Sequence, residues 1–246
     1  MSMGEIVETL DGGVLELTLA RPSKKNALTG AMYSAITAAF QRAQADLSIG
    51  AVLIASEGAD FCAGNDLHDF LGSGGVSPHG PILQFMHALA RLEVPLVAAV
   101  QGRAVGVGAT LLLHCDLVAA APDASLIMPF VNLGLPPEAG SSKLLPALVG
   151  HRVAAEMVLL GRPVGAERAL ALGLINEIAD DPLAAARALA RDLARQPPGA
   201  TRAAKRLLRR EEDSLPERID REAEVFAAAL ATPEFQARAM ALLGRR

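Results

Sequence analysis

The sequence has few cysteines, few aromatic residues and little net charge. Cys62 and Cys115 are the two cysteines among 246 residues, which is too few for a disulfide framework and favours a reducing compartment. Aromatic residues make up 3% of the chain, and the formal net charge is −4. We expect neither stacking platforms for bases nor a basic surface for phosphates, so nucleic acid is not a predicted partner.

The chain also lacks the apolar segments that direct proteins to or across membranes. Its N-terminus has no hydrophobic run typical of a secretion signal, and no apolar run reaches the roughly 20 residues that span a bilayer. The five histidines show no paired spacing of metal ligands. We therefore expect a cytoplasmic protein with no membrane partner and no metal, bacterial by its helices rich in Ala and Arg.

A glycine-punctuated stretch at 94–116 is the most informative part of the chain. Residues 95–100 form a short apolar run typical of a buried strand, and residues 109–115 form a second run that predicts a helix. Glycines at 102, 106 and 108 permit a sharp turn between them. Backbone N–H groups at the start of such a helix lack partners. They can bind an oxyanion or a phosphate, and a tight turn without a ligand is the alternative.

Known glycine motifs do not fit this turn. No Lys-Ser or Lys-Thr pair follows Gly108, as a phosphate-binding loop requires. The glycines follow the order G-x-x-x-G-x-G, which differs from the dinucleotide fingerprint. Val107 lies between two glycines where a nucleophile elbow has serine.

Strands and helices alternate along the first two thirds of the chain. Strands are predicted at 6–10, 14–19, 51–55, 117–121 and 125–128, and amphipathic helices at 29–45 and 81–92. Asp11-Gly12-Gly13 predicts a hairpin between the first two strands. Polar or glycine-containing loops follow at 23–26, 56–67 and 129–143. This order favours βαβ units and a mostly parallel sheet.

The last third of the chain is predicted to be helical. Helices are expected at 153–160, 166–172, 182–195, 201–208, 214–230 and 233–243, with one short strand at 175–178. We divide the chain into a core domain at 1–180 and a helical C-terminal region at 181–246. Arg206 and Arg209 precede a run of acidic residues, so their charges indicate a solvated helix end.

Several motifs in a fixed order resemble one family over nearly the whole chain. They are Arg21-Pro22 with Asn26-Ala27-Leu28, the loop Phe61-Cys62-Ala63-Gly64-Asn65-Asp66-Leu67, the stretch 95–116, residues 133–140, Gly161-Arg162 and residues 169–175. Together they resemble the crotonase, or enoyl-CoA hydratase/isomerase, superfamily. The resemblance implies an α/β spiral of ββα units and a helical C-terminal region that assembles a homotrimer or a dimer of trimers.

The resemblance also implies a site that stabilises the enolate of an acyl-CoA thioester. Its oxyanion hole consists of the backbone N–H groups of Asn65 and Val107, with Ala63, Gly64, Asp66, Leu67 and Gly106 around them. Lys24 and Ala27 correspond to the loop that lies along coenzyme A. Coenzyme A is part of the substrate, so no separate cofactor is expected.

Departures from the hydratase pattern decide the expected reaction. The hydratases have glutamates at the positions of Thr110 and Phe130, so both acids are absent here. Glu138 lies in Pro137-Glu138-Ala139-Gly140-Ser141-Ser142, which is similar to a loop of the peroxisomal-type Δ3,Δ2-enoyl-CoA isomerases. A double-bond shift needs one proton-carrying carboxylate, and the resemblance gives this role to Glu138.

Alternative interpretations remain at the sequence level. Glu138 can instead be a loop acid that caps the following helix. The chain can also be a hydratase, another acyl-CoA enzyme of this family, or an acyl-CoA-binding homologue without catalysis. Asp66 is interpreted as a loop-stabilising acceptor, Asp116 as an anchor for backbone N–H groups, and His114 as a core residue. Cys62 is interpreted as an inert buried thiol.

Overall fold

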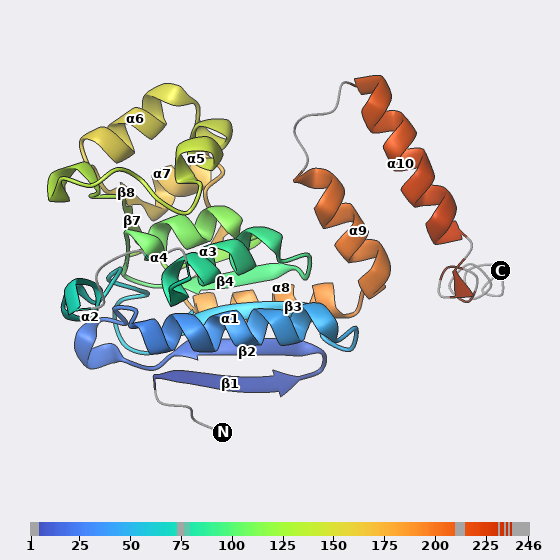
Figure 1. Cartoon of the computed structure of the whole chain (residues 1–246), viewed down its shortest axis with the longest axis horizontal. Helices are drawn as coiled ribbons and strands as arrows, with labels where there is room; N and C mark the ends of the chain where they lie inside the picture. Colours follow the sequence, from blue (N-terminus) through green and yellow to red (C-terminus); the bar gives the residue numbers. More distant parts are fainter. Residues whose placement is uncertain are drawn as a thin grey trace.

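Two sheets form the centre of the molecule in the computed structural model of the chain (Figure 1). The structure describes residues 5–72, 77, 79–209, 215–230, 232, 233, 235 and 237. The larger sheet has the order β1 (Ile6–Asp11), β2 (Val14–Leu19), β3 (Ala51–Ser56), β4 (Leu96–Val100), β6 (Leu117–Ala120) and β9 (Glu177–Ile178). The smaller has the order β5 (Arg103–Val105), β7 (Ser125–Ile127) and β8 (Val164–Gly165).

The larger sheet is parallel except at its first strand. β1 and β2 form the predicted antiparallel hairpin, in which Asp11 pairs with Val14, and β2, β3, β4, β6 and β9 then pair in parallel. β3 and β4 are almost continuously buried, as expected for strands covered on both faces. The expected mostly parallel sheet is confirmed.

The chain winds as a spiral in which the strands from β4 to β7 lie alternately in the larger and the smaller sheet. β4 lies in the larger sheet, β5 lies in the smaller, and the short helix α4 (Val107–Thr110) follows with the turn η2 (Leu111–His114). β6 and β7 repeat this order before η3 (Val131–Leu133), α5 (Ser141–Val149) and α6 (His151–Leu159). The helix α7 (Ala166–Ala171) joins β8 to β9. The predicted spiral of ββα units is confirmed.

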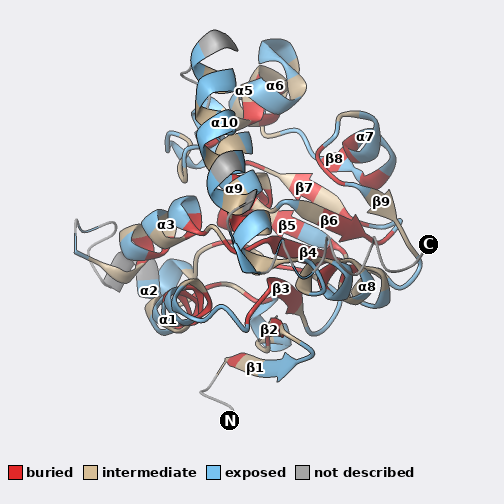
Figure 2. Cartoon of the chain, turned by 90° about the vertical axis from the view of Figure 1, so that its right-hand side faces the viewer, coloured by how far each residue is buried: buried red, intermediate tan, exposed pale blue. Residues whose placement is uncertain are grey.

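Helices cover one face of the larger sheet with an aromatic cluster. α1 (Gly30–Ala45) begins after Thr29, whose hydroxyl accepts a hydrogen bond from the N–H of Met32 at 3.3 Å, and it packs beside α3 (Pro81–Arg91). The rings of Tyr33 and Phe85 lie 5.1 Å apart between centroids. Figure 2 shows the buried side of both helices turned toward the sheet.

The opposite face is covered by α8 (Pro182–Ala194). Its buried alanines, Ala186 and Ala190, pack with Leu53, Val97 and Ala119 of the sheet. By sequence α8 lies in the predicted helical region at 181–246, and by packing it completes the core. That region is therefore not separate from the core along its whole length, and the division at residue 180 stays a prediction.

Some elements differ from the sequence-based expectations. β5 forms within the predicted glycine turn, and α2 (Leu67–Gly72) begins where the predicted loop at 56–67 ends, in a stretch for which the sequence predicts no element. α5 begins at Ser141, inside the predicted loop at 129–143. The predicted helix at 109–115 begins earlier, at Val107, and tightens into the 3-10 turn η2. The helix predicted at 233–243 lies mostly outside the described residues.

The helix α9 (Pro198–Leu208) is attached to the core by basic side chains. Arg202 donates hydrogen bonds to main-chain carbonyls of the last turn of α1 and of the segment that follows it, at 2.8–3.3 Å. Arg206 pairs with Glu93 at 3.3 Å, and Arg209 donates to the carbonyl of His114 at 2.5 Å. Arg206 and Arg209 are exposed at the end of α9, as the sequence indicated, and both also contact distant parts of the chain.

The last described helix, α10 (Leu215–Leu230), packs against α9 and stands away from the sheets (Figure 1). Ile219 and Phe226 are 55% and 67% exposed on it. Exposed apolar side chains of this kind suit a partner surface, and the trimer stays a prediction. No helix in the described ranges is long and apolar enough to cross a bilayer, and the same residues contain no cluster of three potential metal-ligating side chains.

Candidate active site

Two loops meet at the edge of the smaller sheet and form the floor of the candidate site. The N–H of Cys62 donates to the carbonyl of Arg103 at 3.1 Å, and the N–H of Val105 donates to the carbonyl of Cys62 at 2.8 Å. Gly108 packs so closely that an added Cβ would lie 2.7 Å from the carbonyl oxygen of Cys62. The first turn of α4 is thereby held directly against the loop at 61–67.

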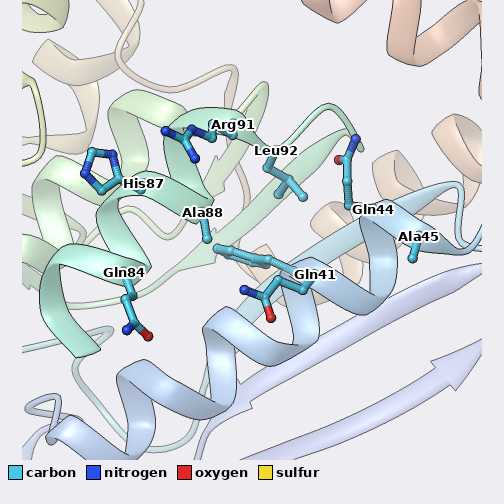
Figure 3. A pocket seen from close by; sticks show the side chains of 9 residues that line it. Gln41, Gln44, Ala45, Gln84, His87, Ala88, Arg91 and Leu92 are labelled. Atoms are coloured by element: carbon cyan, nitrogen blue, oxygen red, sulfur yellow. The ribbon is translucent and has the colours of Figure 1, made fainter. Parts of the chain in front are cut away.

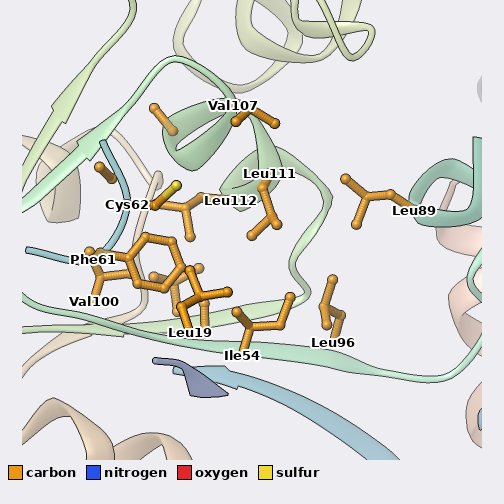
Figure 4. Packing of buried hydrophobic residues seen from close by; sticks show 14 of the residues in the cluster. Leu19, Ile54, Phe61, Cys62, Leu89, Leu96, Val100, Val107, Leu111 and Leu112 are labelled. Atoms are coloured by element: carbon orange, nitrogen blue, oxygen red, sulfur yellow. The ribbon is translucent and has the colours of Figure 1, made fainter. Parts of the chain in front are cut away.

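An apolar layer supports this floor from below. Val107, Leu111 and Leu112 pack with Phe61 and Cys62 above the strands of the larger sheet (Figure 4). Burial raises the pKa of the Cys62 thiol to about 12, so the thiol stays protonated. The interpretation of Cys62 as a buried, inert thiol agrees with this environment.

The two predicted oxyanion donors are unpaired backbone groups of these loops. The N–H of Leu28 donates to the carbonyl of Gly64 at 2.8 Å, and the N–H of Asp66 donates to the carbonyl of Leu28 at 2.9 Å. These two hydrogen bonds lie on either side of Asn65 and do not use its N–H group. Val107 is the first residue of α4 and follows Gly106, whose φ of 57° and ψ of −120° suit glycine. Among the described residues, neither the N–H of Asn65 nor that of Val107 donates to a protein acceptor.

The side chain of Asn65 is fixed by a residue that the sequence did not indicate. The hydroxyl of Tyr33 donates to Oδ1 of Asn65 at 2.5 Å. Burial, followed by the nearby Cys62 and Glu138, raises the pKa of Tyr33 well above its usual value, so the phenol remains a donor. Tyr33 is the single tyrosine of the chain and lies on the apolar face of α1. A phenol in a core position needs a polar partner, and that requirement was the available signal.

The loop that contains Glu138 is held by two side chains. Ser141 donates from its hydroxyl to the carbonyl of Glu138 at 2.6 Å. Nε2 of His114 lies 2.8 Å from the carbonyl of Ala139. Because a carbonyl only accepts, Nε2 bears the proton, and burial lowers the pKa of His114 so that the ring stays neutral. His114 is buried as expected, and it also anchors this loop.

The carboxyl group of Glu138 has one bound and one unbound oxygen. The hydroxyl of Thr110 donates to Oε1 at 2.5 Å, whereas Oε2 is buried without a hydrogen-bond partner among the described residues. Burial raises the pKa of Glu138, and the bond from Thr110 opposes this increase. The helix after this loop is capped by Gly140 without a side-chain bond, so the interpretation of Glu138 as a helix cap is wrong.

The positions of the missing hydratase acids lie beside this carboxyl group and in the apolar layer. Thr110 is fully buried at the end of α4, in contact with Glu138. Phe130 is buried and belongs to the main apolar cluster. At these two positions the chain therefore has a hydroxyl and a phenyl ring, whereas hydration would need a carboxylate at each of them.

Asp66 stabilises the loop, as the sequence indicated. Oδ2 of Asp66 forms an ion pair with Arg21 at 2.8 Å, and Oδ1 accepts from the N–H groups of His68 and Asp69 at 3.0 and 3.2 Å. The hydrogen bond from Arg21 holds the pKa of Asp66 below its usual value. Leu67 begins α2 with an exposed side chain.

The predicted coenzyme A loop follows β2. Lys24 is exposed at the end of the turn η1 (Pro22–Lys24), and Ala27 is half-buried. Asn26 between them is fully buried and donates to the carbonyls of Glu57 and Asp60, both at 2.8 Å. A buried amide with saturated bonds fixes the loop, and the contacts of Lys24 and Ala27 with coenzyme A stay a prediction.

A separate groove of about 550 Å³ lies between α1 and α3 (Figure 3). It is lined by Gln41 and Gln44 of the first helix and by Gln84 and His87 of the second, with apolar residues between them. None of the predicted site residues lines this groove. The candidate active site is therefore assigned from the two loops and Glu138.

Comparison with known proteins agrees with this geometry. The chain matches the family Enoyl-CoA hydratase/isomerase over residues 9–245. It is 36% identical over 191 residues to 1,2-epoxyphenylacetyl-CoA isomerase of Escherichia coli K12, covering 73% of this chain and 71% of that protein. It is 38% identical over 179 residues to enoyl-CoA delta isomerase 2 of Rattus norvegicus, covering 70% of this chain and 46% of the longer rat protein.

A solved structure gives the same result for the fold. A protein from Magnetospirillum magneticum AMB-1, named as an enoyl-CoA hydratase/carnithine racemase, superposes with a TM-score of 0.94 at 43% identity. The match covers 100% of this chain and 98% of that one. The chain therefore belongs to the enoyl-CoA hydratase/isomerase family, the crotonase superfamily.

Proposed function

We propose that this crotonase-family enzyme moves the double bond of a 3-enoyl-CoA to the 2-position, with Glu138 as the proton carrier. The observation that supports this proposal best is the buried, unpartnered Oε2 of Glu138. Burial raises the pKa of this carboxyl group, which suits a base that must also return its proton near neutral pH.

The proposed reaction has two proton transfers. Oε2 of Glu138 takes a proton from C2, and the electrons of the C–H bond form the enolate of the thioester. The enolate oxygen accepts from the N–H groups of Asn65 and Val107, each worth a few kcal/mol in such sites. Glu138 then returns the proton to C4, and the double bond lies between C2 and C3. No atom is gained or lost in the sequence.

The same geometry argues against efficient hydration. Addition of water needs groups that orient and deprotonate it, and such assistance contributes roughly 100- to 10,000-fold. The hydroxyl of Thr110 donates a hydrogen bond to Glu138, and Phe130 has an apolar ring. Neither side chain can deprotonate water. Two of the relatives described above are named as isomerases of CoA thioesters and other relatives are named as hydratases, so support for isomerisation rests on these side chains.

The test is a comparison of two substrates. We expect the enzyme to convert 3-enoyl-CoA to the conjugated 2-enoyl-CoA, followed by the absorbance of the conjugated thioester, and to hydrate 2-enoyl-CoA slowly. Rapid hydration would identify a hydratase. Binding of both substrates without turnover would identify an acyl-CoA-binding homologue.

Substitution of Glu138 tests the proton carrier. Glu138→Gln keeps the shape of the side chain and cannot carry a proton, so turnover is expected to fall by at least about 1000-fold while thioester binding is retained. Glu167→Gln is the matched control, since Glu167 is exposed on α7. If Glu138→Gln isomerises at the parent rate, Glu138 is not the base and Asp66 is the next residue to test.

A further inference from the structure

We infer that Thr110 is a positioning residue that binds one oxygen of Glu138 so that the other oxygen carries the proton in both transfers. This inference rests on the proposed function. It assigns a task to a position that the sequence marks only by the absence of an acid.

The contact between Thr110 and Glu138 is specific. The hydroxyl oxygen of Thr110 lies 2.5 Å from Oε1 of Glu138 and 3.5 Å from the carbonyl of Val107. A hydroxyl has one proton to donate, and the shorter contact with a charged acceptor takes it. The side chain is fully buried and β-branched, which restricts its rotation.

The same short helix positions both parts of the reaction. Val107 begins α4 and supplies an oxyanion N–H, and Thr110 ends α4 and orients the base. The position of the enolate oxygen and the orientation of the carboxylate are therefore tied together through four residues. A carboxylate fixed in this way presents Oε2 toward the same face of the substrate during both transfers.

A single free oxygen matters for a 1,3-shift because the proton must stay on the carboxyl group between the two steps. Oε2 has no acceptor or donor among the described residues, so no described protein group removes the proton. If Oε1 were also free, the group could rotate and exchange its proton with water. The bond from Thr110 thus favours internal transfer from C2 to C4.

Other titratable groups around Glu138 do not interfere at neutral pH. They come from three segments packed against the carboxyl group: Tyr33 of α1, Cys62 of the loop at 61–67 and His114 of η2. The pKa values of Tyr33 and Cys62 are raised by burial, and that of His114 is lowered by burial. Tyr33 and Cys62 therefore do not contribute to the acidic limb of the pH profile, and the infrared carboxyl band separates the titration of Glu138 from that of His114.

The experiment compares Thr110→Val, which has nearly the same shape without the donor, with Thr110→Ser, which keeps the hydroxyl. Loss of a hydrogen bond to a carboxylate is expected to move the acidic limb of kcat/KM upward by about one pH unit or more. At pH 7 we expect kcat to fall about 10-fold with KM nearly unchanged, and transfer of a C2 deuterium to C4 to decrease. In Thr110→Ser, the acidic limb of kcat/KM and the transfer of deuterium from C2 to C4 are expected to match those of the parent.

A second readout does not need turnover. The pKa of Glu138 is measured by difference infrared titration of the carboxyl band against Glu138→Gln, and Thr110→Val is expected to raise it. The control is Thr201→Val. Thr201 lies on α9, and its hydroxyl donates to the carbonyl of Pro197 at 2.9 Å, so this variant removes a comparable hydroxyl. This control is expected to change neither the limb nor the carboxyl band.

Three results would overturn the inference. One is an unchanged limb and unchanged label transfer in Thr110→Val. Another is an equal loss in the valine and serine variants with a rise in KM, which indicates packing alone. The third is a failure of the proposed function, recognised separately because the parent would not isomerise 3-enoyl-CoA or Glu138→Gln would remain active.

Discussion

The buried side chain of Lys205, which pairs with the more exposed Asp116, makes the stability of the protein rise with pH. Lys205 is 5% exposed on α9, and its Nζ lies 2.6 Å from Oδ2 of Asp116 and 2.7 Å from the carbonyl of Val94. Asp116 also accepts from the N–H of Leu96 at 2.7 Å, as the sequence indicated. Burial lowers the pKa of Lys205 to about 8, although Asp116 opposes this shift.

The sign and size of the effect follow from proton binding. The ordinary pKa of lysine is 10.5, so between about pH 8 and 10.5 the unfolded chain binds more protons at this site than the folded chain does. Stability rises with pH wherever the unfolded state binds more protons. A shift from 10.5 to about 8 corresponds to ~3 kcal/mol at about 1.4 kcal/mol per unit.

The assay is urea unfolding at pH 7.5, 8.5, 9.5 and 10.5, followed by circular dichroism, for the parent and Lys205→Met. Subtracting the unfolding free energy of the variant from that of the parent isolates Lys205, because Cys62, Cys115 and Tyr33 are present in both proteins. We expect this difference in unfolding free energy to rise by ~3 kcal/mol in favour of the parent across the series. Arg206→Met is the control, since it removes an exposed cation from the same helix. A difference that stays flat or falls with pH refutes the reasoning.

Three further predictions concern the site and the assembly. Tyr33→Phe removes the donor to Asn65 (2.5 Å) and is expected to lower kcat roughly 3- to 10-fold with little change in KM, as steady-state kinetics would show; a change confined to KM would contradict a role in orienting the loop. Hydration of crotonyl-CoA is expected to be at least about 100-fold slower than isomerisation. The double variant Thr110→Glu, Phe130→Glu is expected to reduce this difference in rate. Equal rates of hydration and isomerisation in the parent would mean that Thr110 and Phe130 do not correspond to the two hydratase glutamates. Sedimentation is expected to give a trimer or a dimer of trimers, because Phe226 on α10 is largely exposed; a monomer mass at every concentration would reject this assembly.

The sequence predicted the frame of the fold because its patterns are local. The hairpin at Asp11, the alternating strands and the amphipathic helix at 29–45 depend on neighbouring residues, and the structure confirms each of them. β5 escaped prediction because three residues between glycines show no periodicity. α5 escaped prediction because Pro146 lies inside it, and an internal proline normally indicates a helix end.

The candidate site was predictable in its members more than in its contacts. The motifs indicated Asn65, Val107 and Glu138, and the structure places them on adjoining loops with the expected free backbone donors; their catalytic roles stay predictions. The bond from Thr110 to Glu138 spans 28 residues and that from Tyr33 to Asn65 spans 32. Pairings at such separations depend on the spiral as a whole, so local patterns did not reveal them.

The division of labour within α4 has a consequence for how this enzyme can evolve. In the proposed mechanism the enolate forms against the main-chain N–H of Val107, the first residue of α4, and this group survives replacement of any side chain that preserves the turn. The fate of the enolate depends on side chains, and Thr110 lies three residues later on the same helix. On this proposal, side-chain changes at Thr110 and Phe130 can redirect a common intermediate toward a different product while the backbone donors that stabilise the intermediate stay in place.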